Sequence, residues 1–431
     1  MTPRPALPPL TRQFWVIAHR WAGLTLALFL AVAGFTGIFL SWNAQLEAMT
    51  APHLLRASPP AASAPMRDPA QLAAQAQARH PGMIVTYLPL TVHPGESLHL
   101  RVMWQNGAPH PNWDELFINP WTGAELGHRH WGDIGEGWVN LMPLVYRLHY
   151  SLLLGESGEL AMGLAALVWT LDCFVGFWLT LPVKGPVKGP IRQAQAKRQP
   201  GWWARWRPSW AVRWGASGYK LNFDLHRAGG LWVWPALLVF AWSSVSFNLP
   251  GVYNPIMRQF GARDTAAAIA AHTLPAPRLN PALGLAAAKA GPNMAPGGTT
   301  WLWHAPAQGA YYYGFTTRSD VPDEGGASRL MFDSNTGQLI GTDIAGARPA
   351  ANTATEWLGA LHMARVGGMA WRVAVTVLGA VVTMLCITGI VIWMRKRSGR
   401  VSRRAKLRPG SPQRGSITRE SMTRPSTSRA V

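Results

Sequence analysis

Four apolar stretches constrain this chain more than any other feature. Each runs for about 20 residues with one charge or none, which is the length that a helix needs to cross a bilayer. They cover residues 22–41, 160–181, 231–249 and 373–394. A helix that is apolar on all sides must be buried or surrounded by lipid, so we expect an integral membrane protein with four spans. The third stretch is the shortest and contains Pro235.

The distribution of basic residues predicts how the chain sits in the membrane. The net charge of +20 would by itself suggest a nucleic-acid partner. However, nine Lys or Arg residues lie within residues 184–220 without any acid, and twelve lie within residues 395–429 beside one acid. The long segments between spans mix both signs. This is the positive-inside pattern of a membrane protein, so we expect no nucleic-acid partner. It predicts that both termini and the 184–220 loop lie in the cytoplasm, and that residues 43–157 and 250–368 lie outside.

An internal repeat divides the chain into two copies of one unit. Residues 14–24 (FWVIAHRWAGL) match residues 222–231 (NFDLHRAGGL), and residues 144–155 (LVYRLHYSLLLG) match residues 357–368 (WLGALHMARVGG). Both copies begin on the cytoplasmic side, so the repeat is parallel and its pseudo-two-fold axis should follow the membrane normal. The predicted fold class is a membrane α-helical protein: a four-helix transmembrane bundle from a parallel internal duplication, with two external α+β domains.

The repeat and the charge pattern set the expected domain boundaries. In chain order these are a first span (12–42), a first external domain (43–137), a histidine-bearing segment with the second span (138–183), a basic cytoplasmic loop (184–220), a third span (221–249), a second external domain (250–355), a histidine-bearing segment with the fourth span (356–397) and a disordered basic cytoplasmic tail (398–431).

Each external domain is predicted to contain one helix and three strands. The expected helices cover residues 69–79 and 281–290, and the expected strands cover residues 84–90, 97–104, 116–119, 299–304, 310–317 and 328–333. In each copy one turn follows the third predicted strand, and the two turns match. They are Asn-Pro-Trp-Thr-Gly at 119–123 and Ser-Asn-Thr-Gly at 334–337.

Four histidines occupy equivalent places at the membrane edges. His19 and His226 precede spans one and three, 207 residues apart, and His149 and His362 precede spans two and four, 213 residues apart. Ionisable residues at this depth are uncommon and usually functional. Imidazole is a common axial ligand of haem iron, and four helices can supply facing pairs, so we expect two b-type haems, one near each face. A histidine at a helix end can also be a simple packing residue at the interface, and this alternative stays open.

Small and basic neighbours fit the haem hypothesis. Gly23 and Gly230 lie one helical turn beyond His19 and His226, where they would leave room for a flat macrocycle. Arginines could hold the haem propionates through charge-assisted bonds. The candidates are Arg20, Arg227 and Arg365, of which the first two are explained equally well by the positive-inside rule.

Other polar residues in or near the spans leave their roles open. Asp172 lies in the middle of span two, where a charge is costly, and its repeat mate is Leu385. Proton transfer, a haem contact and a hydrogen-bonded packing role are all compatible with it. Cys173 and Cys386 both fall inside spans, so no disulfide is expected in the external domains.

The chain resembles the PepSY-associated transmembrane family, which includes inner-membrane ferric-siderophore reductases and iron-regulated membrane proteins. The resemblance rests on HRWAGLTLALFLAVAGFTGIF (19–39), RLHYSLLLGESG (147–158) and FINPWTGAELG (117–127), and it covers most of residues 12–397. It implies four spans, two external PepSY-like domains, haem held at the four histidine positions and electron transfer to iron-loaded siderophores. The second copy departs from the pattern, with Trp-Ser-Ser (242–244) where the first has Phe-Thr-Gly (35–37).

Together these features predict a haem-containing oxidoreductase of the bacterial inner membrane. Electrons would cross the bilayer to a periplasmic acceptor, most simply a ferric siderophore, and release Fe(II). The chain has no Gly-x-Gly-x-x-Gly motif followed by a matching acid, so the donor would be a separate cytosolic reductase or a quinol. No catalytic residue is assigned. The alternative is a non-enzymatic, membrane-anchored regulator of a peptidase or of iron uptake, which would carry no chromophore.

Overall fold

A computed structural model describes residues 11–105, 111–183, 201–263, 298–321 and 328–406. Within these ranges, three helices are long and apolar enough to cross a membrane: α1 (Arg12–Leu40), α6 (Gly155–Thr180) and the first part of α15 (Gly368–Lys406). The predicted spans one, two and four fall on these helices. The described part of the chain is therefore that of a helical membrane protein with three or four candidate spans.

The predicted third span is not one continuous helix. It is divided into α9 (Gly218–Trp232) and α10 (Trp234–Asn248), which are bent by 70°. Val233 at the break has φ −107° and ψ 8°, outside helical geometry, and Pro235 follows in the first turn of α10. Proline has no N–H to donate to a preceding turn, but it is tolerated where a new helix begins. Pro235 therefore explains why the chain restarts here.

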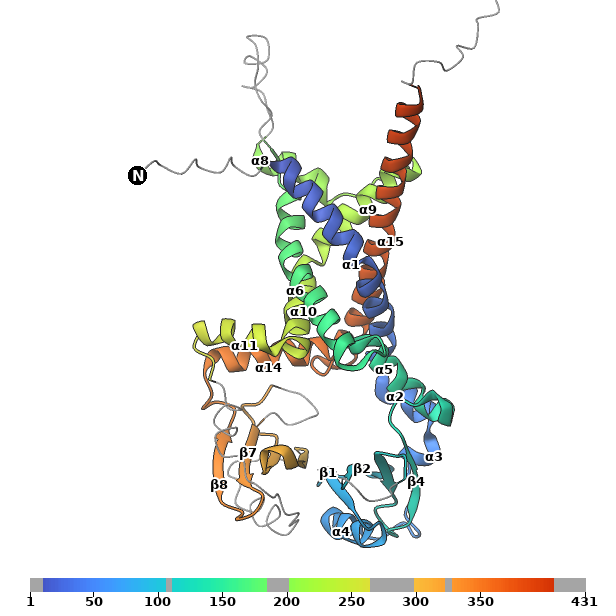
Figure 1. Cartoon of the computed structure of the whole chain (residues 1–431), viewed down its shortest axis with the longest axis vertical. Helices are drawn as coiled ribbons and strands as arrows, with labels where there is room; N and C mark the ends of the chain where they lie inside the picture. The colour runs from blue at the N-terminus through green and yellow to red at the C-terminus, as the bar shows by residue number, and fades with distance from the viewer. Residues whose placement is uncertain (1–10, 106–110, 184–200, 264–297, 322–327, 407–431) are drawn as a thin grey trace, which may run out of the picture.

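The spanning helices form one bundle above the sheet in Figure 1. α1 packs along α15, and α6 packs along α10. Where α1 and α15 cross, a Cβ added to Gly379 would lie 2.6 Å from the carbonyl oxygen of Gly34. The reverse addition at Gly34 would lie 2.9 Å from the carbonyl oxygen of Gly379. Two glycines thus let the backbones approach closely, as small residues commonly do between membrane helices.

Short helices lie between the bundle and the sheet (Figure 1). They are α2 (Asn43–Thr50), α3 (Pro52–Leu55), α5 (Leu141–Ser151), α11 (Pro250–Gln259) and α14 (Ala350–His362). The segments carrying His149 and His362 are therefore separate helices, not the first turns of the spans. Gly155 and Gly368, each six residues after its histidine, start the following span with φ of 58° and 56°. A residue without a Cβ adopts this left-handed conformation at little cost.

One antiparallel sheet of eight strands connects the two predicted external domains. Its order is β4-β3-β2-β1-β5-β6-β7-β8, and Leu88 of β1 pairs with Leu302 of β5 at the junction. The two predicted external domains therefore share one sheet. The bounds are β1 Met83–Pro89, β2 Leu98–Trp104, β3 Glu115–Ile118, β4 Glu125–Arg129, β5 Thr300–Ala305, β6 Ala310–Phe315, β7 Ser328–Asp333 and β8 Leu339–Asp343.

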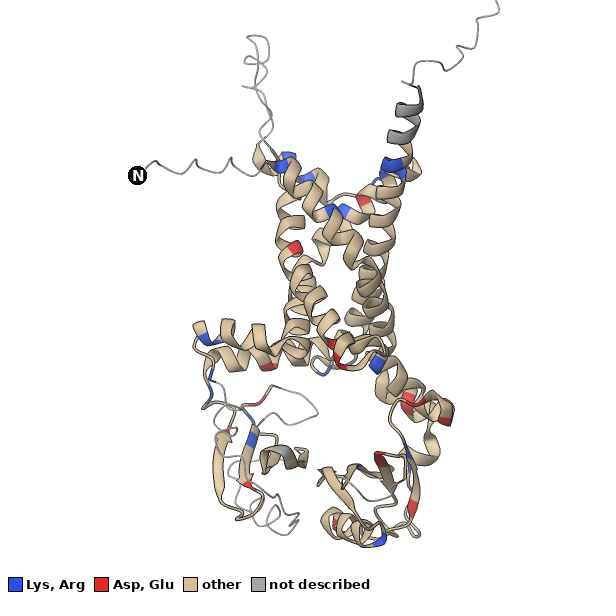
Figure 2. Cartoon of the chain, viewed as in Figure 1, with Lys and Arg blue, Asp and Glu red and all other residues tan. Residues whose placement is uncertain are grey.

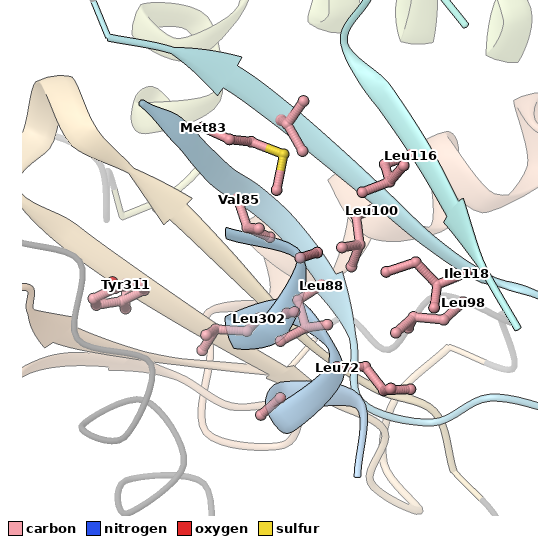
Figure 3. Packing of buried hydrophobic residues seen from close by; sticks show 14 of the residues in the cluster. Leu72, Met83, Val85, Leu88, Leu98, Leu100, Leu116, Ile118, Leu302 and Tyr311 are labelled. Carbon is pink, nitrogen blue, oxygen red and sulfur yellow. The ribbon is translucent and has the colours of Figure 1, made fainter. Parts of the chain in front are cut away.

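The core of the sheet continues across this junction. Helix α4 (Pro69–Arg79) matches the predicted helix, and the side chain of Asp68 caps it by accepting from Ala70 N. Leu72 of α4 packs with Leu88 and Leu302 in a cluster that reaches Tyr311 of β6 (Figure 3). The two halves therefore bury their apolar residues together. The predicted helix at 281–290 lies outside the described residues.

Matched polar features recur in the two halves of the sheet. Asn119 Oδ1 accepts from the N–H groups of Trp121 and Thr122, and Asp333 Oδ1 accepts from those of Asn335 and Thr336. Both predicted turns are therefore present, each closed by its own Asx side chain.

Each half of the sheet also has an ion pair between equivalent strands, with the acidic and basic residues on opposite strands in the two halves. Glu115 faces Arg129 across β3 and β4, and Arg329 faces Asp343 across β7 and β8. Each pair joins the strands on either side of its Asx turn.

The predicted C-terminal tail falls partly on a helix and partly, at 407–431, outside the described residues. Residues 398–406, expected to be disordered, continue the backbone of α15 to Lys406. The segment is rich in Arg and Lys, which have good helix propensity, so the helix outlasts its apolar part.

We expect Gly379→Leu to destabilise the bundle because its side chain would collide with α1. Overpacking of this kind costs roughly 1–3 kcal/mol. Thermal unfolding of the detergent-solubilised protein should show a lower midpoint. The control is Gly251→Ala in α11, whose added Cβ would meet nothing within 4 Å. Equal shifts in the two variants would contradict this helix contact.

The Glu115 ion pairs predict a loss of stability in acid. Burial favours the neutral acid, but His99 and Arg129 outweigh it and lower the pKa of Glu115 from 4.5 to about 2. Stability from this group is complete above pH 4.5 and is lost as the pH falls towards 2, by roughly 3 kcal/mol. Thermal midpoints between pH 7 and 2 measure it. Glu115→Gln should flatten that pH dependence; an unchanged slope would refute the assignment.

Candidate haem-binding histidine pairs

The structure brings His19 and His226 together at the end of the bundle far from the sheet. His19 lies on α1 and His226 on α9, and their ring centroids are 6.2 Å apart with planes inclined by 61°. His19 lies in the first third of α1 (Arg12–Leu40), and His226 lies just past the middle of α9 (Gly218–Trp232). Because of the break after α9, the helix that carries His226 runs at an angle of 70° to α10.

His149 and His362 form a second pair at the end nearest the sheet. His149 lies on α5 and His362 on α14, and their ring centroids are also 6.2 Å apart, with planes inclined by 84°. Phe240 of α10 stacks on His362 at 4.6 Å between centroids. An aromatic wall of this kind limits the orientations that the His362 imidazole can adopt.

The separation within each pair fits one metal ion held between two imidazoles. A bond from a metal to an imidazole nitrogen is about 2 Å long, so two rings that bind one ion from opposite sides have centroids roughly 6 Å apart. Haem iron accepts two axial imidazoles in this way. The centroid distances at both pairs are therefore those that bis-histidine ligation requires.

Each of the four histidines has an oxygen within hydrogen-bond distance of Nδ1. The partners are Asp172 Oδ1 for His19 (2.9 Å), Thr36 Oγ1 for His149 (2.9 Å), the Leu385 carbonyl and Thr388 Oγ1 for His226 (3.1 Å each) and Ser243 Oγ for His362 (2.7 Å).

These oxygens all act as acceptors. The hydroxyl of Thr36 donates to Val32 O, that of Ser243 to Phe240 O and that of Thr388 to Met384 O. The Asp172 carboxylate and the Leu385 carbonyl can only accept, and the hydroxyls of Thr36 and Ser243 have carbonyl acceptors of their own, so this arrangement favours a proton on Nδ1 and leaves the lone pair on Nε2. Metal-binding histidines in proteins are usually oriented by a hydrogen bond of this type.

Glycines lie beneath three of the imidazoles. A Cβ on Gly176 would be 3.3 Å from Cε1 of His19, one on Gly389 would be 3.4 Å from Cε1 of His226, and one on Gly37 would be 3.5 Å from Cε1 of His149. Gly176 and Gly389 each follow the histidine of their own copy by 27 residues. Each of these imidazoles thus lies against the backbone of a neighbouring helix.

The predicted glycines and arginines have different surroundings. A Cβ on Gly23 would meet nothing within 4 Å, whereas one on Gly230 would meet Leu385 at 3.9 Å. The Nε atoms of Arg20 and Arg227 are buried without a hydrogen-bond partner among the described residues. The Arg227 guanidinium is already engaged, since Nη2 donates to Asp224 Oδ1 at 3.2 Å and to the Pro208 carbonyl at 2.7 Å. The orphaned Nε of Arg20 therefore fits an anionic group such as a haem propionate better than that of Arg227 does.

Arg365 lies at the junction of bundle and sheet. Burial raises the pKa of Tyr87 in β1, and the positive charges of Arg101 and Arg365 oppose that rise. Arg365 is therefore close enough to β1 to act on a phenol of the sheet.

The sequence alone did not identify the residues that orient the imidazoles. Thr36 and Ser243 follow His19 and His226 by the same 17 residues, and both lie in the tripeptides that differ between the copies. This shared offset was the one signal in the sequence that could have identified Thr36 and Ser243 as equivalent residues. It could not show that Thr36 serves the histidine of a different helix, since that contact depends on packing.

No group of three or more His, Cys, Asp or Glu side chains that could bind a metal ion occurs among the described residues. In the external part, His128 stacks on Trp113, and His130 lies 3.8 Å from Asp114.

Comparison with known families agrees with this architecture. The model of the PepSY-associated TM region matches residues 16–396, which is most of the chain. The chain belongs to this family. No curated protein matches it. Membership covers both the helices and the sheet, because the matched range includes β1 to β8 as well as α1 and most of α15.

Proposed function

We propose that this PepSY-associated membrane protein is an oxidoreductase that holds two b-type haems and carries electrons across the bilayer to an acceptor on the sheet side. The observation that carries the proposal is the pair of equal 6.2 Å imidazole separations at opposite ends of the bundle. The Nδ1 hydrogen bonds support it further, since they leave Nε2 available at all four histidines.

The proposal includes a four-span bundle built by parallel duplication. In it, α9 and α10 together make the third span. Several equivalences between the copies support it. His149 and His362 are each followed after six residues by a left-handed glycine, and Thr36 and Ser243 orient histidines of the same pair. The strand order is also equivalent on the two sides of the β1–β5 junction, since β1, β2, β3 and β4 follow one another outward on one side and β5, β6, β7 and β8 do so on the other.

The charge distribution supports a location in the bacterial inner membrane with both termini in the cytoplasm. Lys and Arg gather at the ends of α1 and α15 that lie farthest from the sheet (Figure 2). By the positive-inside rule this end is cytoplasmic. The His19–His226 pair then lies near the cytoplasmic face, and the His149–His362 pair lies near the periplasmic sheet.

A haem at each pair would supply reversible one-electron transfer. The chain itself contributes the rest. The hydroxyls of Thr36 and Ser243 orient the imidazoles of His149 and His362 through Nδ1, and Asp172 does so for His19. Arg20, whose Nε has no hydrogen-bond partner among the described residues, would neutralise a propionate at the cytoplasmic site, whereas Arg227 is already paired with Asp224.

A ferric siderophore is the acceptor that this arrangement favours. Reduction of its Fe(III) by one electron gives Fe(II), a softer ion that hard oxygen ligands hold less strongly. The electron would come from a cytosolic reductase or a quinol, because the sequence contains no nicotinamide or flavin motif.

The visible spectrum of the purified protein tests this function. We expect a Soret band, with α and β bands that sharpen on addition of dithionite. His19→Ala and His149→Ala should each lose about half of the haem, and each should retain the other site. Pyridine haemochrome stoichiometry measures the loss.

Two outcomes would contradict the proposal. A colourless protein from haem-replete cells would favour the non-enzymatic regulator. Loss of the same haem from both variants would refute the pairing by depth. His128→Ala, in which the altered histidine stacks on Trp113 in the sheet, is the matched control and should keep both haems.

A further inference from the structure

The four Nδ1 acceptors differ in charge. Those of His149, His226 and His362 are neutral hydroxyl or carbonyl oxygens. His19 alone faces a carboxylate, with Asp172 Oδ1 at 2.9 Å and Oδ2 at 3.0 Å from its Nδ1. The two histidine pairs thus have matching geometry but different electrostatic surroundings.

This difference occurs at one position of the repeat. Asp172 follows His149 by 23 residues, and Leu385 follows His362 by the same number. In the second copy the backbone carbonyl of Leu385 accepts from His226, so an acceptor is available without any charge. A carboxylate is therefore not needed to orient the imidazole, and its presence at Asp172 requires another explanation.

Asp172 is well placed to act through His19. Its side chain is 12% exposed and belongs to α6, an apolar helix of the bundle. Among the described residues, the only side chain to which it is hydrogen-bonded is His19. A charge in such surroundings is weakly screened, so its effect is concentrated on the neighbouring imidazole.

A carboxylate acceptor makes an imidazole a stronger electron donor through Nε2. Outer-shell partners of this kind raise ligand basicity and stabilise the more positive state of a bound metal. Hydrogen bonding around the ligands is one of the means by which proteins set haem potentials. The site at His19 should therefore be harder to reduce than the site at His149 and His362.

We propose that Asp172 is a positioning residue that makes the His19–His226 site the lower-potential site of the two, so that electrons pass towards His149–His362 and the sheet. This inference rests on the proposed function. One electron lost at the first site is gained at the second, with the donor a reductase or quinol and the acceptor a ferric chelate. The direction of transfer is thereby set by one side chain.

Optical redox titration in lipid nanodiscs tests this inference. The His149→Ala background, which keeps only the His19–His226 haem, identifies the site. In that background Asp172→Asn should raise the midpoint potential, by about 59 mV for a tenfold change in the one-electron equilibrium. Asp172→Glu should restore the lower value.

A second variant works in the opposite direction. Leu385→Asp places a carboxylate at the equivalent position beside His226, so it should lower the midpoint of the same haem even if Asp172→Asn loses haem. Thr36→Val, which removes a neutral acceptor from His149, is the matched control. In the otherwise unaltered protein it should leave the lower midpoint unchanged.

The outcomes separate the two proposals. A wild-type protein without a Soret band defeats the proposed function. A wild-type protein with two haems, in which neither Asp172→Asn nor Leu385→Asp moves the midpoint of the His19–His226 haem, defeats only the role of Asp172. A shift confined to the His149–His362 haem also overturns that role.

Discussion

The hydrogen bond at Nδ1 of each paired histidine is the interaction on which the candidate sites depend. An unpartnered imidazole in an apolar bundle would cost free energy and could rotate. Each acceptor here comes from a helix other than the one that carries the histidine, so the bond also records how the helices pack. The contact of Gly34 with Gly379 also depends on helix packing, because it sets how closely α1 approaches α15.

The sheet and the bundle are coupled through short helices that also carry the site. α5 and α14 lie between the two parts and hold His149 and His362, while Arg365, just after α14, acts on Tyr87 in β1. A ligand held against the sheet would thus be close to one histidine pair and far from the other. The shared eight-stranded sheet gives this junction a continuous support, because β1 and β5 join the two halves.

The two halves of the chain match at many positions and differ at a few equivalent ones. The copies share turns, left-handed glycines and paired imidazoles, yet they differ at Asp172 and Leu385 and in the continuity of the third span. In the proposed electron conduit, full symmetry would give no built-in direction. For that proposal, differences at equivalent positions are therefore more informative than the features that the copies share.

The sequence by itself determined the apolar helices, most of the strands, both Asx turns and the four histidine positions, because each depends on local composition, periodicity or a repeated offset. It also determined the family, since the matched motifs are contiguous. Only the tertiary structure decided that β1 pairs with β5, that the third span bends after Trp232, and that Asp172 faces His19. The strand pairing and the Asp172–His19 contact join residues roughly 150 to 210 positions apart, so they depend on how helices and strands pack. Pro235 marked where the third span could break, but not the 70° angle between its two parts.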